Sequence, residues 1–135
     1  MANTFHLQIV TVDGLSFDGN VQRVTLRTVH GDIAILARHI NYCTAVGMGT
    51  ARVLCEDGTE RTAACIGGMI SMMENECRLL PTTWEWSDEI DLQRAESAKA
   101  RAEAALQKGG LSDEAQILIE AKLMRALVRI GSAKM

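Results

Sequence analysis

The spacing of apolar residues changes near residue 87, and this change limits the possible folds more than any other feature of the sequence. From Phe5 to Leu80 the apolar residues alternate with polar ones in short runs, which glycine, Asn and Asp residues interrupt. A period of two broken by turn residues is typical of short strands. After Trp86 alanine becomes abundant, β-branched residues become scarcer, and every lysine of the chain occurs. The sequence therefore predicts a strand-rich domain over residues 1–86 and a helical domain over residues 87–135.

The strand-rich part contains too many short strands to form one flat sheet with a buried apolar face. The alternation predicts strands over residues 5–12, 21–29, 32–37, 50–54, 61–66, 69–73 and 76–80. Turns are expected at residues 13–14, 18–20, 30–31, 57–58 and 74–75, and the pair Gly67-Gly68 is expected to form a turn or bulge rather than a phosphate site. Two packed antiparallel layers bury the apolar faces of such strands, so we expect an N-terminal antiparallel β-sandwich.

Two helices are expected after the sandwich. Ser87 can cap the first, and the acidic residues at positions 88, 89 and 91 would place negative charge on its first turn, where the helix dipole favours anions. Gly109-Gly110 can end this helix, and Ser112 can begin the second. The predicted fold class is a β-sandwich followed by a C-terminal two-helix antiparallel hairpin.

The seam between the two helices is rich in alanine. The apolar positions that recur at spacings of three and four are Ala95, Ala98, Ala102 and Ala105 on the first helix and Ala115, Leu118, Ile119, Leu123, Ala126, Leu127 and Ile130 on the second. Alanine removes little apolar surface from water, at about 25 cal/mol per Å². We therefore expect weak packing and a mobile hairpin whose conformers a ligand or partner can shift. Permanent docking of both helices on the sandwich is the alternative.

Composition and local motifs argue against several classes of protein. A net charge of −3 without clustered Lys and Arg argues against nucleic-acid binding. The cysteines at positions 43, 55, 65 and 77 form no CxxC pair and no His-Cys cluster, so no metal site is expected. The start of the chain resembles neither a signal peptide nor an import sequence, and no apolar stretch approaches the ~20 residues needed to cross a bilayer. These features indicate a reducing cytoplasm.

Motifs of common catalytic sites do not occur in the sequence. There is no GxxxxGK[ST] loop, no GxSxG elbow and no HExxH pair, and the histidines at positions 6, 30 and 39 are scattered. His39 could act as a base, but a histidine in a loop between strands is more often structural or solvated. No catalytic residue is predicted, and the chain is not expected to be an enzyme by itself.

Charged residues of the helical part allow two interpretations. Asp91 and Arg94 share a helix face with Ala95, where an intrahelical ion pair worth about 0.2–0.5 kcal/mol is the simplest interpretation. Arg125 and Arg129 lie one turn apart, with a lysine on the same stripe and no acidic residue three or four positions away from either. The helix dipole and solvent can satisfy them. They could instead bind carboxylates of a partner or phosphates of a nucleotide.

Several segments occur in an order and spacing that one family shares. They are LQIVT at 7–11, FDGNV at 17–21, TVHGDIAILARH at 28–39, the pair Gly68-Met69, IDLQRA at 90–95 and EAKLMRALVRI at 120–130. Together they resemble the epsilon subunit of F-type ATP synthases, of the bacterial type, over essentially the whole chain. The family often has glycine at the position of Ala34 and proline at those of Ala37 and Asn41, so the loop after the third strand is expected to follow a different path.

The resemblance implies a central-stalk subunit that couples proton or sodium translocation to ATP synthesis. Its sandwich would bind the gamma subunit and rest on the ring of c subunits, with Gly31, Asp32 and His39 as contact positions. Its helical hairpin would fold down or extend, and when extended it would reach the alpha and beta subunits and inhibit ATP hydrolysis. Such a subunit has no catalytic site and is peripheral on the cytoplasmic face of the bacterial plasma membrane, which it meets only through the complex.

The resemblance also implies ATP, with or without magnesium, as a regulatory ligand rather than an obligatory cofactor. In some bacterial members the folded hairpin binds ATP, and the matching positions here are Glu85, Ile90, Asp91, Arg94, Ala95, Arg125 and Arg129. A polyphosphate between the helices would satisfy both arginines of the second helix. A free-standing nucleotide-binding regulatory module is the alternative function, and co-purification with a gamma subunit separates the two.

Overall fold

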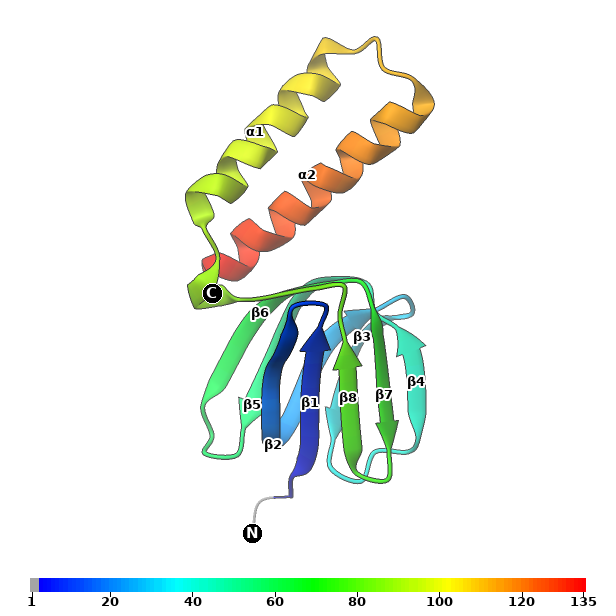
Figure 1. Ribbon diagram of the computed structural model, residues 1–135, viewed down its shortest axis with the longest axis vertical. Coiled ribbons are helices and arrows are strands. Elements are labelled where there is room, and N and C mark those ends of the chain that lie inside the picture. The colour runs from blue at the N-terminus through cyan, green and yellow to red at the C-terminus, as the bar shows by residue number, and fades with distance from the viewer. Residues whose placement is uncertain (1–2) are drawn as a thin grey trace.

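The computed structural model describes residues 3–135 and shows a β-sandwich with a helical hairpin standing at one end of it (Figure 1). The sandwich strands are β1 (Phe5–Thr11), β2 (Gly14–Thr28), β3 (Gly31–Leu36), β4 (Tyr42–Ala45), β5 (Met48–Cys55), β6 (Glu60–Ile66), β7 (Met69–Met73), β8 (Glu76–Leu80) and β9 (Thr83–Trp86). A short 3-10 helix, η1 (Ser87–Glu89), leads to α1 (Leu92–Lys108) and α2 (Asp113–Ala133). The predicted fold class is confirmed.

Strand β2 belongs to both layers of the sandwich. The hydrogen-bonded order is β4-β7-β8-β1-β2-β5-β6-β9, and β3 also pairs with β2. The first half of β2 pairs with β1 as far as Val21, and the second half pairs with β5 from Val21 onwards and with β3 from Arg23 onwards. The register shifts between these two residues, as expected where an irregularity bends a strand from one layer into the next.

Strands β1 and β8 run parallel, with His6 opposite Glu76 and Ile9 opposite Leu79. The expectation of purely antiparallel layers is therefore wrong at this seam. Alternation in a sequence determines which face of a strand is buried, but it does not determine the neighbouring strand. A parallel pair needs a long crossover, which the segment from β2 to β7 provides.

Alternating side chains from both layers fill the core. Phe5, Leu7 and Ile9 of β1 are buried, and they meet buried residues from the other strands, among them Val21, Val24, Leu26, Ile35, Val53, Ile70, Met72 and Leu79. Burial of a large apolar side chain contributes about 1.5–3 kcal/mol relative to exposure. In the described part of the chain this core cluster includes no residue of α1 or α2, so the sandwich has a core independent of the hairpin.

Some predicted strand boundaries differ from the structure. The turn predicted at residues 18–20 is wrong, because β2 continues through these residues and pairs with β1 there. The sequence pattern does not predict β4 or β9, each of which has only 4 residues. Pairing with β7 and β6 defines these two strands, and such short segments depend on their partners more than on intrinsic propensity.

The helices begin and end at capping residues. The prediction that Ser87 caps the first helix is wrong, because Ile90 is extended and α1 begins only after Asp91. Asp91 is the cap, since its side chain accepts a 3.0 Å hydrogen bond from the backbone N–H of Arg94. Gly109, with φ of 71°, ends α1 as predicted. Ser112 caps α2, since its Oγ accepts a 3.2 Å hydrogen bond from the Ala115 N–H.

The hairpin meets the sandwich mainly through the end of α2. The helices pack against each other at Ala95, Ala102 and Ala126, which are buried as the alanine stripe predicts. It is α2 that contacts β5 and β6. There Ser132, which is fully buried, shares a 2.7 Å hydrogen bond with Thr50 of β5. The hairpin is therefore joined to the sandwich at its base, while its far end extends away (Figure 1).

The cysteines of the sandwich are free thiols. Burial raises the pKa of Cys65 and that of Cys77 to about 12 each, which keeps these two thiols protonated and unreactive at neutral pH. Within residues 3–135, no group of His, Cys, Asp and Glu side chains is arranged to hold a metal ion. Over the same range no helix has the length and apolar character needed to span a bilayer.

The turn between β6 and β7 depends on Gly68. Its φ is +105°, and an added Cβ would lie 2.2 Å from the Leu80 carbonyl oxygen. We expect Gly68→Ala to lower the free energy of unfolding by about 2–4 kcal/mol, from backbone strain and this clash together. Gly58 is the matched control, because its φ is +90° but a Cβ would meet nothing within 4 Å. Urea unfolding of both variants measures the difference, and equal losses would contradict the role given to the close approach.

Candidate functional site: a cleft between the hairpin and the sandwich

A cleft of about 890 Å³ lies where the hairpin meets the sandwich. Its walls come from four parts of the fold, the β1–β2 turn, β9 with the residues just before it, the linker and the facing sides of α1 and α2. The lining residues are Thr11, Asp13, Thr82, Thr83, Trp84, Glu85, Glu89, Ile90, Asp91, Arg94, Ala95, Ala98, Arg101, Ala102, Ala105, Ile119, Lys122, Arg125, Ala126 and Arg129. The small alanine side chains leave the space between the helices open, so the seam that packs weakly also creates this cleft.

The cleft contains all of the positions that the sequence suggested for a nucleotide. Glu85, Ile90, Asp91, Arg94, Ala95, Arg125 and Arg129 all line it. They come from β9, the linker, the first turn of α1 and the second half of α2. The fold therefore brings together residues that are up to 44 positions apart.

Arg129 has a partner that no local pattern could show. Its Nε donates a 2.5 Å hydrogen bond to Oε1 of Glu85, and both side chains are about one-third exposed. The bond joins α2 to β9 across the base of the cleft. Arg125, one turn earlier, is half-buried and forms no hydrogen bond or ion pair with the residues from 3 to 135. Its guanidinium group is therefore available to a ligand.

Asp91 and Arg94 do not form the ion pair that helix spacing suggested. The Asp91 carboxylate accepts the backbone N–H of Arg94 instead and caps α1. Over the described residues, the Arg94 guanidinium group has no acidic partner within ion-pair distance. Capping thus fixes the start of α1 and leaves the arginine side chain on the cleft wall.

The sequence interpretation missed several residues of the cleft, among them Arg101 and Trp84. Arg101 lies two turns after Arg94 on the same face of α1 and lines the cleft. Its spacing of seven residues was a usable signal. Trp84 also lines the cleft, and its indole N–H is buried without a hydrogen-bond acceptor among residues 3–135. No sequence signal singled out this tryptophan, because β9 itself was not predicted.

The other predicted contact positions lie at opposite ends of the sandwich. Gly31 and Asp32 begin β3 opposite the end of β2, and Asp32 accepts a 3.0 Å hydrogen bond from Arg27. His39 lies in the β3–β4 loop, where its ring packs edge-on against Tyr42. This loop contacts the β7–β8 turn through the Arg38 N–H and the Asn75 side chain. The three residues therefore do not form one site.

Two family models together cover almost the whole chain. The one described as "ATP synthase, Delta/Epsilon chain, beta-sandwich domain" matches residues 4–87, and the one described as "ATP synthase, Delta/Epsilon chain, long alpha-helix domain" matches residues 88–134. The chain belongs to the ATP synthase delta/epsilon chain family. The junction between the two matches falls within η1, after the last strand and before α1.

Curated relatives of this family member are named epsilon chains. The ATP synthase epsilon chain of Clostridium botulinum (strain Eklund 17B / Type B) is 38% identical over 135 residues, covering 100% of this chain and 99% of the relative. The "ATP synthase epsilon chain, sodium ion specific" of Acetobacterium woodii is 37% identical over 102 residues, covering 76% of this chain and 77% of the relative. The predicted epsilon subunit of an F-type ATP synthase is therefore confirmed.

Solved ATP synthase structures contain chains of the same fold. One chain of the Euglena gracilis mitochondrial ATP synthase matches with a TM-score of 0.84 at 19% identity, covering 98% of this chain and 82% of that chain. One chain of the Tetrahymena thermophila mitochondrial ATP synthase matches with a TM-score of 0.65 at 10% identity, covering 95% of each chain. At these identities the likeness establishes the fold.

Proposed function

We propose that this epsilon-family chain is a non-catalytic subunit of the rotor stalk whose helical hairpin senses ATP and restrains ATP hydrolysis. The observation that carries the proposal is the cleft, which gathers Arg94, Arg125 and Arg129 from two helices around one open volume. Guanidinium groups bind phosphate oxygens through charge-assisted hydrogen bonds. A polyphosphate in the cleft would contact both helices at once.

The charges of the cleft are divided in a way that suits a nucleotide. Cations line the facing sides of the helices, with Arg94 and Arg101 on α1 and Arg125 on α2, while carboxylates such as Glu85 and Asp13 come from the sandwich side. The helices therefore offer donors to phosphate groups, and the sandwich offers acceptors to hydroxyl or amino groups. A nucleotide carries both kinds of group.

Ligand binding would control the hairpin through its weak seam. A ligand that bridges α1 and α2 stabilises the folded hairpin by about 2.7 kcal/mol when its concentration is a hundred times Kd. Few large side chains are buried between the helices, since Ala95, Ala102 and Ala126 form the buried seam. A free energy of this size changes the ratio of folded to extended hairpins about 100-fold.

The remaining parts of the proposal concern partners and location. The sandwich would bind the gamma subunit and the c ring, and because Asp32 and His39 lie at opposite ends of β3, they would make separate contacts. The extended hairpin would reach the alpha and beta subunits. The chain would then be peripheral on the cytoplasmic face of the bacterial plasma membrane, held there only by the complex.

Isothermal titration of the full chain with ATP, with and without magnesium, tests the nucleotide proposal. We expect heat of binding that saturates at one nucleotide per chain, and absence of heat at millimolar ATP would remove the claim. Lys108→Ala is the matched control, because this variant loses an exposed cation of the hairpin that lies outside the cleft. Its binding should equal that of the unchanged chain.

Co-purification distinguishes the stalk subunit from a free-standing nucleotide-binding module. The cleft is formed by this chain alone, which is the observation that favours the module as the second candidate. Recovery of an assembly that contains a gamma subunit supports the stalk subunit. Recovery of a solitary chain that binds ATP supports the module.

A further inference from the structure

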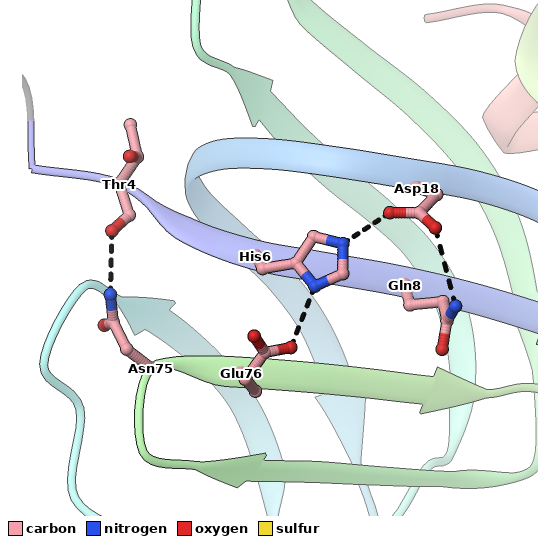
Figure 2. Close-up of polar contacts among 6 residues, drawn as sticks. All are labelled: Thr4, His6, Gln8, Asp18, Asn75 and Glu76. Atoms are coloured by element: carbon pink, nitrogen blue, oxygen red, sulfur yellow. Dashed lines mark hydrogen bonds and ion pairs between the residues drawn. The ribbon is translucent and has the colours of Figure 1, made fainter.

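His6 lies between two carboxylates that come from the neighbouring strands of β1 (Figure 2). Its Nδ1 is 2.8 Å from Oε2 of Glu76 on β8, and its Nε2 contacts Oδ1 of Asp18 on β2. The Gln8 side chain donates a 3.5 Å hydrogen bond to the other oxygen of Asp18. One imidazole ring therefore connects three adjacent strands across the outer face of the sheet.

The two contacts require a protonated ring. An ionised carboxylate only accepts hydrogen bonds, and a neutral imidazole has a single N–H. Only the imidazolium can donate to both carboxylates at once. The hydrogen bonds to Glu76 and then to Asp18 raise the pKa of His6, and the hydrogen bond from His6 lowers the pKa of Asp18.

Other groups on the adjoining strands do not provide a competing positive charge next to the ring. On β2 the residue paired with His6 is Asn20, and on β7 the residue paired with Glu76 is Met73. The nearest cation of β8 is Arg78, which pairs with Gln8 rather than with His6. The ring is thus the positive member of a cluster whose other two members are negative.

The same end of the sheet is connected to the β3–β4 loop through Asn75. Its carbonyl oxygen accepts the His6 backbone N–H at 3.2 Å. Its side chain donates to the Thr4 carbonyl oxygen at 3.0 Å and accepts the Arg38 N–H at 2.8 Å (Figure 2 shows the Thr4 contact). The position of the first strand and that of the loop that carries His39 are therefore coupled.

We propose that His6 is a proton-operated clamp, in which the imidazolium holds Asp18 and Glu76 together and deprotonation loosens the start of β1 and the attached β3–β4 loop. The clamp acts on the parallel seam between β1 and β8, and parallel pairs are slightly less stable per residue than antiparallel ones. It gives this end of the sandwich a rigidity that depends on pH. It does not depend on nucleotide binding, because the cleft lies at the other end of β1.

The direction in which the stability of the clamp depends on pH follows from the shifted pKa values of His6 and Asp18. Because the pKa of His6 is raised by folding, its stabilisation is complete below the ordinary value of about 6.5 and is lost as the pH rises through the raised pKa. Because the pKa of Asp18 is lowered, its contribution is present above about 3.9 and is lost as the pH falls through the lowered pKa. The contacts of His6 with both carboxylates are therefore present between the lowered pKa of Asp18 and the raised pKa of His6. They are lost on the alkaline side, when His6 loses its proton.

NMR titration of the full chain tests the clamp directly. We expect the ring signals of His6 to titrate at a higher pH in the unchanged chain than in the double variant Asp18→Asn with Glu76→Gln. Amide protection factors at Leu7 and Arg38, corrected for intrinsic exchange, should fall several-fold between about pH 6 and about pH 9, across the His6 titration. The control Glu103→Gln removes a carboxylate of α1 far from the cluster and should change neither result.

The variant His6→Gln separates the clamp from a general loss of structure. Its side chain cannot gain or lose a proton in this range, so protection at Leu7 should no longer vary with pH, while the core amides remain protected. An unchanged His6 titration in the double variant would overturn the proposal. Persistence of the pH-dependent protection in His6→Gln would overturn it as well.

Discussion

Removal of residues 88–135 is expected to leave a folded sandwich that still assembles into the ATP synthase and to raise ATP hydrolysis by that enzyme several-fold. The sandwich should fold because its buried cluster contains no side chain of α1 or α2 in the described residues. Hydrolysis should rise because the proposed inhibitory element is the hairpin itself. Circular dichroism of the truncated chain and an ATPase assay of the reconstituted enzyme measure the two effects.

The truncation also exposes the sandwich surface that α2 covers, and this effect needs a control. Thr50 loses its hydrogen-bond partner Ser132 when the hairpin is removed. The variant Ser132→Ala in the full chain removes the same partner while keeping the hairpin. Any change in hydrolysis that results only from the lost Thr50 hydrogen bond should therefore be seen in this variant. Unchanged hydrolysis after truncation, with normal assembly, would show that this family member does not inhibit through its helices.

Replacement of Arg125 by alanine is expected to weaken ATP binding by about 10-fold to 150-fold, because a hydrogen bond to a charged group contributes about 1.5–3 kcal/mol. The stability of the chain should change little. Arg125 is half-buried and has no hydrogen bond or ion pair within residues 3–135, so its removal leaves no partner unsatisfied. Titration calorimetry gives the affinity, and urea unfolding gives the stability.

Arg129→Ala provides a contrast at the neighbouring turn of α2. Its loss removes a ligand contact and also leaves Glu85 without its 2.5 Å partner. We therefore expect weaker ATP binding together with looser docking of the hairpin on β9. Equal affinities for the unchanged chain and both arginine variants would contradict the placement of phosphates between the helices.

The strands and helices were largely predictable because their pattern is local. The alternation of Phe5, Leu7 and Ile9 determines which face of β1 is buried, and the caps Gly109 and Ser112 define the hairpin turn. The continuation of β2 through Asp18-Gly19-Asn20 was not predictable, because these residues favour turns and only pairing with β1 keeps them extended. The parallel seam was missed for the same reason, since only tertiary pairing creates it.

The candidate site was predicted as a set of positions but not as a set of contacts. The resemblance to epsilon subunits indicated Glu85 and Arg129 as site residues, and the structure shows that they bond to each other across 44 positions. Likewise, His6 carries no sequence signal of its own, because its two partners lie 12 and 70 residues away. Helix spacing paired the Arg94 guanidinium group with Asp91, but the Asp91 carboxylate accepts the Arg94 backbone N–H instead.

The attachment of the hairpin at one end gives it the mechanics of a lever. Helix α2 has 21 residues, so at 1.5 Å per residue it is about 30 Å long. A rotation of roughly 20° at its base, near Ser132, would carry the Gly109-Gly110 turn through about 10 Å, by the same helix geometry. Spectroscopic labels at that turn would therefore report a small rotation at the base of α2 as a displacement that distance measurements resolve easily.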